Sequence, residues 1–430
     1  MSGDATRPEG GDVLVAIERA VAAIRRDPRD ARGWSALAAA YFTLGQHDDA
    51  VQALERARAI DPADFDSALR HAASLLELGR DEEALAVARD AAAVDPTSAD
   101  PHFIAGNVHA SRGEHTEAAD AFARAASLAP RAAGDDAQRA TALAHYNRAL
   151  ALDELGRWTD AARACEAALA LEPELWPALA QLVFLKRRLC EWDGVDALSA
   201  RLREAVADER EGITPFSFLA EPATPAEQLR CASTWARSIL ARSPGIPVGG
   251  ASAPTAQRRS AAKSVGAEAP PTVNPTRPAR MRVGLVSSGF NNHPTALLTV
   301  ELIERLRESS ITTIGFATTA SDGGALRGRI AHAFHEFVEL DGDAHATMAQ
   351  RIRDARIDVL FDLRGYGGGS VSEVFAMRPC ARQVNWLAYP GTSGAPFIDV
   401  MIADSFVVPA DAEPHYSERI VRMPHAFQPC

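Results

Sequence analysis

Residues 31–62 read ARGWSALAAAYFTLGQHDDAVQALERARAIDP, and this stretch decides the fold of the first half of the chain. Gly45 stands where a first helix would end, and Pro62 stands where a second helix would stop, since glycine closes helices and proline cannot continue them. The prolines recur at intervals of 34 residues and then once after 43: Pro28, Pro62, Pro96, Pro130 and Pro173. A period of this length is typical of stacked helical hairpins.

The small and aromatic residues of this unit match the tetratricopeptide pattern. Trp34, Ala38, Tyr41, Ala50, Leu54 and Ala57 occupy its positions, and three further units repeat the pattern around the next prolines, the last after an insertion of nine residues. The sequence therefore predicts an α-solenoid over residues 12–190, closed at each end by a half-repeat. We expect its groove to bind an extended segment of an acceptor protein. The alternative is an array that only spaces or dimerises the following domain.

The rest of the chain has three different compositions. Residues 191–242 look helical but irregular, which predicts a connector, and residues 243–280 are rich in proline and alanine, which predicts a linker. Residues 281–430 alternate strands and helices, so we expect a Rossmann-like parallel α/β lobe with ligands at the carboxyl ends of its strands. The expected strands lie within 281–288, 311–320, 337–340, 358–365, 382–391, 399–404 and 418–424.

Composition narrows the class of protein. The net charge is -12 and there are only two lysines, so no basic stripe indicates nucleic acid as a partner. The five cysteines are widely spaced, which argues against a zinc site or a disulfide framework and favours a reducing cytoplasm. No apolar run is long enough to predict a membrane span, and the first residues lack the apolar core of a secretory signal.

The loop after the first expected strand is the strongest candidate for chemistry. Asn292, His293, Pro294 and Thr295 stand at the turn into a helix. Proline at the first helical position leaves the neighbouring amides free for an anion such as a phosphate, Thr295 can add a hydroxyl, and His293 can exchange a proton near neutral pH. The alternative is a capping turn whose histidine is only packed or exposed.

Two other loops and one acidic turn also carry unusual residues. The glycine-rich stretch 365–369 allows backbone to approach a ligand, and 389–394 combines a rigid turn with hydroxyls; each could equally be a structural turn. Asp341 and Asp343 have the spacing of a D-x-D metal motif, but Asp-Gly is ordinary turn chemistry, and we favour the turn.

In the sequences of these loops, the chain resembles the protein O-linked N-acetylglucosamine transferases of bacterial type. The stretches that carry the resemblance are RVGLVSSGFNNHPTALL, LFDLRGYGGG, FAMRPCARQVNWLAYPGTSGAP and HYSERIVRMPHAF, in this order after tetratricopeptide repeats. The resemblance implies an inverting glycosyltransferase of the two-lobed GT-B type. It would transfer N-acetylglucosamine from UDP-GlcNAc to serine or threonine hydroxyls of proteins, with no metal or other cofactor.

The resemblance also assigns roles to residues. It makes His293 the catalytic residue, places Thr295 near the donor diphosphate, and places Leu387 and Ala388 at the pocket for the N-acetyl group. Together with the three loops considered above, these roles give the substrate-binding residues that we expect: Asn292, Pro294, Thr295, Gly365, Tyr366, Leu387, Ala388, Tyr389 and Thr392.

The chain departs from the family pattern in several places. Gly289 stands where many members have an acidic residue, and the asparagine ladder of animal arrays is reduced to Asn147 among Ala36, Arg70 and Ile104. The sequence given stops at Cys430, after the first lobe, so we expect the second lobe to be missing and activity alone to be weak or nil. A non-catalytic tetratricopeptide interaction module is the alternative function.

Overall fold

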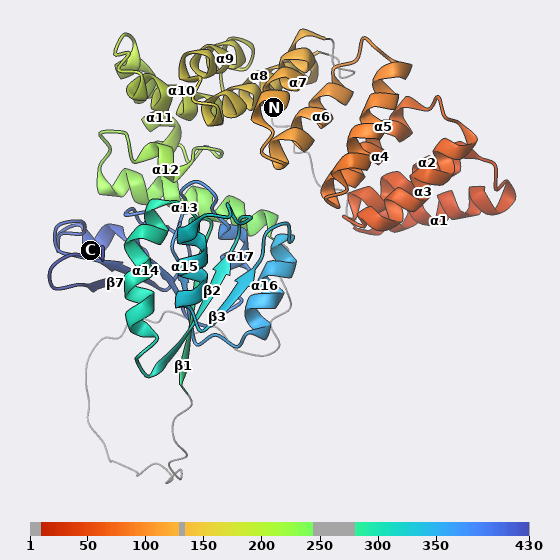
Figure 1. Ribbon diagram of the computed structural model, residues 1–430. Coiled ribbons are helices and arrows are strands. Elements are labelled where there is room, and N and C mark those ends of the chain that lie inside the picture. The colour runs from red at the N-terminus through yellow and green to blue at the C-terminus, as the bar shows by residue number, and fades with distance from the viewer. Residues whose placement is uncertain (1–9, 129–133, 244–279, 430) are drawn as a thin grey trace, which may run out of the picture. The chain divides into compact units, whose positions relative to one another are not determined.

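The computed structural model describes residues 10–128, 134–243 and 280–429 (Figure 1). The chain divides into two compact units, Met1–Leu202 and Arg203–Cys430. Most of the predicted linker at 243–280 lies outside the described residues.

The first unit is a stack of helical hairpins, as the proline period predicts. Gly45, Gly79, Gly113 and Gly156 all lie between the two helices of a hairpin with φ of 68° to 72°, a backbone conformation that glycine adopts without strain. The helices are α1 (Gly10–Arg26), α2 (Ala31–Thr43), α3 (His47–Ile60), α4 (Phe65–Glu77), α5 (Asp81–Val94), α6 (Asp100–Ser111), α7 (His115–Ser127), α8 (Asp135–Glu154), α9 (Trp158–Leu171), α10 (Trp176–Arg188) and, across the boundary between the units, α11 (Val195–Ala207).

Small residues let these helices pack closely. Ala50, Ala57, Ala84 and Ala91 have no exposed surface, so the neighbouring helices cover these positions completely. The inserted residues of the fourth unit lengthen a helix instead of forming only a loop. α8 has 20 residues, whereas the corresponding α2 and α4 have 13.

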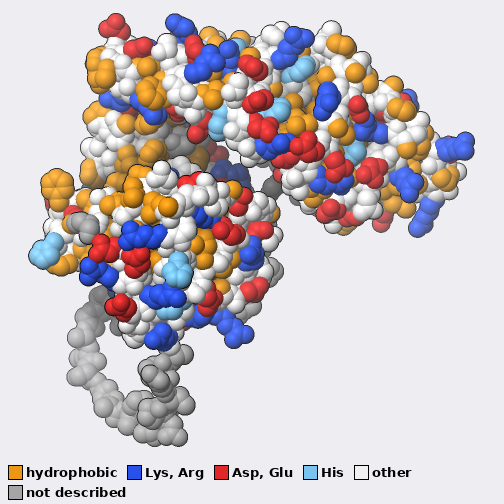
Figure 2. All heavy atoms as spheres, viewed as in Figure 1, with side chains coloured by type: hydrophobic (Ala, Val, Ile, Leu, Met, Phe, Trp, Pro, Cys, Tyr) orange, Lys and Arg blue, Asp and Glu red, His pale blue; other side chains and the backbone are white. Residues whose placement is uncertain are grey.

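Polar side chains link the first helices of successive hairpins. Ser67 Oγ donates to Ser35 Oγ at 2.9 Å, and Asn147 Nδ2 lies 3.5 Å from Asn107 Oδ1. Figure 2 shows acidic and basic side chains interspersed over this unit, without a large patch of one sign on the visible face. The array therefore offers a mixed polar and apolar surface to a partner.

The second unit contains a seven-stranded sheet with the order β3-β2-β1-β4-β5-β6-β7, and each neighbouring pair is parallel. The Rossmann-like lobe that the alternation predicts is thus confirmed. Its strands are β1 (Met281–Ser287), β2 (Ile311–Ala317), β3 (Glu336–Glu339), β4 (Val359–Asp362), β5 (Gln383–Asn385), β6 (Val400–Ala403) and β7 (Arg419–Arg422). The chain moves outward from β1 to β3 and then crosses to β4 on the other side of β1. The helices that follow β1 and β4 therefore pack on opposite faces of the sheet, and the loops that lead to them start side by side at a topological switch point.

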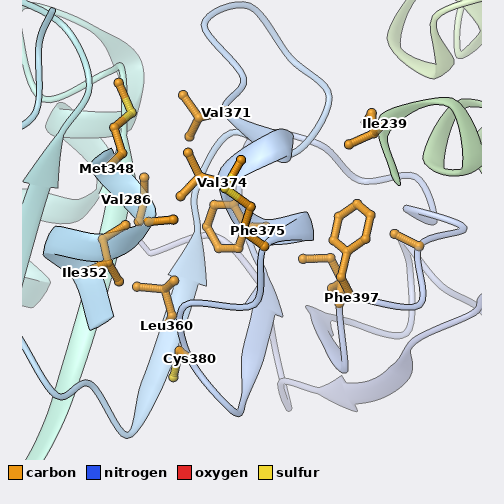
Figure 3. Close-up of a cluster of buried hydrophobic side chains, with 14 of the residues drawn as sticks. Ile239, Val286, Met348, Ile352, Leu360, Val371, Val374, Phe375, Cys380 and Phe397 are labelled. Carbon is orange, nitrogen blue, oxygen red and sulfur yellow. The ribbon is translucent and has the colours of Figure 1, made fainter. Parts of the chain in front are cut away.

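Helices cover both faces of the sheet. α14 (Pro294–Leu306) and α15 (Ala325–Ala333) lie side by side and share a core with β1 and β2 (Figure 1). The opposite core joins α16 (His345–Asp354) and α17 (Ser372–Ala376) to β1, β2 and β4 (Figure 3).

The helix α13 (Pro225–Arg242), at the end of the predicted connector, belongs to this second core. Its Ala232, Ala236 and Ile239 are buried with Phe375 and Phe397 (Figure 3). A short helix, α12 (Pro215–Phe218), precedes it, and Leu219 also packs on the cluster. Segment 215–242 is therefore part of the α/β unit's packing.

An apolar groove of about 390 Å³ remains on the α14 side of the sheet. Its walls include Met281 and Phe361 from the strands, Leu306 from α14, and Phe427 from the last described segment. Met281 is 52% exposed. The residues that line the groove include neither His293 nor Arg364, so it is separate from the site described next.

Candidate functional site

The switch point brings two of the predicted loops into contact. The loop after β1 carries His293 and the loop after β4 carries Arg364, and their nearest nitrogens, Nε2 and Nη1, are 3.2 Å apart. Both loops leave the carboxyl ends of adjacent parallel strands, where doubly wound sheets bind ligands.

The capping turn that the sequence left as an alternative is present at His293. Its backbone is extended, with φ −142° and ψ 149°, and Pro294 follows as the first residue of α14. The imidazole Nδ1 accepts a hydrogen bond from the Thr295 amide at 3.1 Å. One of the helix's free amides is therefore already bound by the histidine itself.

Neighbouring segments fix the shape of this loop. The Asn292 amide donates to Asp322 Oδ2 at 2.8 Å, and Arg327 Nη1 donates to the Phe290 carbonyl at 2.9 Å. Asp322 also accepts from the Gly324 amide, and these backbone donors lower the pKa of its carboxyl group. The loop after β1 is thus held from both sides before any ligand binds.

Gly289 gives His293 its place. A Cβ atom at position 289 would lie 2.7 Å from His293 Nδ1 and 2.9 Å from Thr295 Cβ. The imidazole therefore occupies space that any side chain at 289 would need. Gly289, which stands where the resemblance would lead us to expect an acidic residue, therefore leaves room for the imidazole in this position.

The loop after β4 is built around a buried carboxyl group. Asp362 Oδ1 accepts from the amides of Arg364 and Gly365, both at 2.9 Å, while burial raises the pKa of Asp362. Arg364 Nε donates to the Gly368 carbonyl at 2.8 Å, and its Nη2 donates to the same oxygen. The guanidinium is therefore oriented by its own loop and presents Nη1 to His293.

The loop after β5 supports the loop after β4. Gly365 has φ 53°, and a Cβ there would lie 2.6 Å from Tyr389 Cβ, so the Tyr389 side chain packs directly on the Gly365 backbone. The rings of Tyr366 and Tyr389 meet edge to face with centroids 5.3 Å apart. Thr392 Oγ1 donates to Glu418 Oε2 at 2.8 Å. Through these contacts, the loop after β5 packs closely against the loop after β4.

Exposure separates the predicted site residues into two groups. Asn292 and Pro294 are exposed, and His293 and Ala388 are partly exposed. The others are buried: Thr295, Gly365, Tyr366, Leu387, Tyr389 and Thr392. The Thr295 side chain in particular is covered, with 3% of the residue's surface exposed.

Sequence reasoning missed Arg364 as a site residue. Its only signal is its place directly after β4 in the DLRG stretch, beside the switch point. Burial and then the nearby Arg364 charge lower the pKa of His293, which favours the neutral imidazole. The site therefore combines the neutral imidazole of His293 with the oriented guanidinium of Arg364 at the carboxyl edge of the sheet.

No group of three or more histidine, cysteine, aspartate or glutamate side chains that could hold a metal ion occurs in the described part of the chain. The D-x-D motif forms a turn, as favoured from the sequence: Gly342 has φ 76°, and Asp343 pairs with Arg351. Within the same residues, no helix has both the length and the apolarity needed to cross a bilayer.

Comparison with known proteins finds separate matches for the first and second halves of the chain. Residues 269–428 match the model of glycosyl transferase family 41, and residues 9–65, 69–137 and 142–175 match models of the tetratricopeptide repeat. A probable UDP-N-acetylglucosamine–peptide N-acetylglucosaminyltransferase SEC from Arabidopsis thaliana is 34% identical over 148 residues, and the Caenorhabditis elegans UDP-N-acetylglucosamine–peptide N-acetylglucosaminyltransferase is 35% identical over 149.

These matches are partial. They cover 34% of this chain but only 15% and 13% of the two relatives' own lengths. Among solved structures, a mutant O-GlcNAc transferase of Thermobaculum terrenum aligns with all of this chain and 60% of its own, at 18% identity and a TM-score of 0.44. The likeness to family 41 rests on the sequence matches over residues 269–428.

Proposed function

We propose that this chain, which matches glycosyl transferase family 41 over residues 269–428 and the tetratricopeptide repeat in its first half, is a member of the O-linked N-acetylglucosamine transferase family and serves in sugar transfer to proteins. The donor would be UDP-N-acetylglucosamine and the acceptor a serine or threonine hydroxyl. The observation that carries the proposal is the meeting of His293 and Arg364 at the switch point within the matched segment 269–428.

The geometry supports a sugar-nucleotide site at this edge. The loops after β1 and β4 offer an imidazole, a guanidinium and the start of α14, groups that suit a diphosphate. Departure of a nucleoside diphosphate leaves negative charge that fixed donors stabilise. We assign His293 to the reacting end of the donor and Ala388, which is partly exposed, to the sugar.

The repeat array would present the acceptor protein. Its hairpins stack as a continuous series from α2 to α9, and such arrays bind extended segments of partners. A cytoplasmic location, which the widely spaced cysteines suggest, goes with this proposal.

Calorimetric titration of UDP-N-acetylglucosamine into the 430-residue chain tests the proposal. We expect saturable binding that His293→Ala weakens about tenfold or more, a loss of at least about 1.4 kcal/mol. His345→Ala is the matched control, because His345 is exposed at the start of another helix of the same unit, α16. UDP-glucose as a second ligand tests whether the N-acetyl group contributes.

The second candidate function is a non-catalytic interaction module, which the extent of the repeat array favours. If the folded chain binds neither UDP nor UDP-N-acetylglucosamine but captures peptides through its repeats, this candidate replaces the first.

A further inference from the structure

The imidazole of His293 has a hydrogen-bond donor on each side. The Thr295 amide lies 3.1 Å from Nδ1, and Arg364 Nη1 lies 3.2 Å from Nε2. A backbone amide and a guanidinium can only donate, whereas a neutral imidazole has one accepting nitrogen and one N–H group. The ring therefore cannot accept from both neighbours at once, and a protonated ring could accept from neither.

Burial decides which nitrogen accepts. The Thr295 residue is 3% exposed, and its amide has no other hydrogen-bond partner among the described residues. A buried amide that loses its partner is costly, whereas Arg364 is partly exposed and keeps two hydrogen bonds to the Gly368 carbonyl. We conclude that Nδ1 accepts from Thr295 and that Nε2 carries the hydrogen.

In this tautomer two donors face each other without an acceptor between them. Nε2–H of His293 and Nη1–H of Arg364 converge at the carboxyl edge of the sheet, beside the first turn of α14. The guanidinium is held by its own loop and cannot turn away without losing its hydrogen bonds to Gly368. An oxygen that accepts from both groups would relieve the conflict.

We propose that His293 and Arg364 form a two-donor clamp for one anionic phosphoryl oxygen, and that Arg364 is thus a binding residue of the site. The inference rests on the proposed function for its ligand, the diphosphate of a nucleotide sugar. A phosphoryl oxygen fits because it accepts from several donors and gains from the guanidinium charge and the N-terminal end of the helix. His293 then acts as a hydrogen-bond donor to the leaving diphosphate.

The charges around the clamp agree with an anionic ligand. Asp322 is engaged by the amides of Asn292 and Gly324. Asp362 is buried beneath the loop, where burial raises the pKa of its carboxyl group and so favours its neutral form. Neither carboxylate has a hydrogen bond to the guanidinium of Arg364 or to the imidazole, so the charge of Arg364 is available to a ligand.

Nitrogen NMR of the histidine-labelled 430-residue chain tests the tautomer directly, with His293→Gln to assign the signals. We expect hydrogen on Nε2 and a bare Nδ1. Hydrogen on Nδ1 would mean that Nε2 accepts from Arg364, and this result would overturn the clamp.

Ligand titrations test the second donor. Inorganic pyrophosphate, UDP and neutral uridine are titrated into the wild type, Arg364→Gln and Arg364→Lys. We expect Arg364→Gln to weaken pyrophosphate and UDP about tenfold or more and to leave uridine unchanged, while Arg364→Lys, which keeps the charge, loses less. Arg382→Gln is the control, because Arg382 is an exposed arginine just before β5, at the opposite edge of the sheet.

The outcomes separate the clamp from the function. UDP binding that is unaffected by Arg364→Gln and Arg364→Lys overturns the clamp but leaves the proposed function standing. Pyrophosphate binding that depends on Arg364, without any binding of UDP-N-acetylglucosamine, supports the clamp and removes the proposed function. An equal loss of uridine and UDP in Arg364→Gln would mean that the arginine only maintains the fold of the site, which also overturns the clamp.

Discussion

Replacing Gly289 with alanine tests whether the position of His293 depends on the missing side chain. The new Cβ would lie 2.7 Å from His293 Nδ1, 2.9 Å from Thr295 Cβ and 3.0 Å from Thr295 Oγ1. Contacts this short require the ring, the start of α14 or both to move. The substitution should therefore break the hydrogen bond that caps the helix.

The expected cost follows from three contributions. Overpacking a closed site costs about 1–3 kcal/mol, and loss of the cap costs about 1 kcal/mol. Alanine has less conformational freedom than glycine in the unfolded chain, and this difference stabilises the folded state by about 0.4–1 kcal/mol. We expect Gly289→Ala to destabilise the second unit by about 1–3.5 kcal/mol, the sum of these effects.

Hydrogen exchange read by mass spectrometry measures this loss in β1 and α14 without interference from the repeat unit. Gly328→Ala in α15 is the matched control, because a Cβ there meets no atom within 4 Å, and it should gain up to about 1 kcal/mol from helix propensity. In a His293→Ala background the cost of Gly289→Ala should fall, since one of its clashes is gone. A Gly289→Ala protein as stable as the wild type, with the His293 NMR signals unchanged, would refute the reasoning.

Two further predictions concern the repeat unit. Gly106→Ala in α6 should destabilise it by about 1–3 kcal/mol despite better helix propensity, because the new Cβ would lie 2.7 Å from the Phe122 ring, and thermal unfolding measures the change. Burial, then Arg58 and Arg80, lower the pKa of His71 to about 4. Between these two pKa values, His71 is protonated in the unfolded chain but neutral in the folded one. The free energy of unfolding should therefore decrease as the pH falls from about 6.5 to about 4. His71→Gln should flatten that loss, and parallel pH profiles of the variant and the wild type would contradict it.

The repeat array was predictable because its signals are local. Gly45 and its counterparts end helices through backbone freedom, and Pro62 and its counterparts stop them through a missing amide, so each hairpin is specified within its own residues. The lobe was predictable as a class, since its strands are short apolar runs between helices. The insertion was less clear from sequence, because whether it extends α8 depends on packing against α7 and α9.

The detailed site was not predictable, because its contacts are long-range. His293 and Arg364 are 71 residues apart, and no local pattern marks the arginine as its neighbour. Tyr366, Tyr389 and Thr392 were expected at the substrate because their loops face the right edge. The structure buries them, and the partner that holds Thr392 is Glu418, 26 residues later and without a motif of its own.

Packing, and not the position of the sequence motifs, shows where the α/β unit begins in the chain. A Cβ at Gly394 would lie 2.4 Å from the Ser233 amide nitrogen, so the loop after β5 rests on the backbone of α13. That loop supports Gly365, whose neighbour Arg364 faces His293. The chain of contacts from α13 to the switch point means that the helix contributes to the site without touching it. The family match begins at residue 269, but the packed unit that orients the candidate site includes Pro225–Arg242.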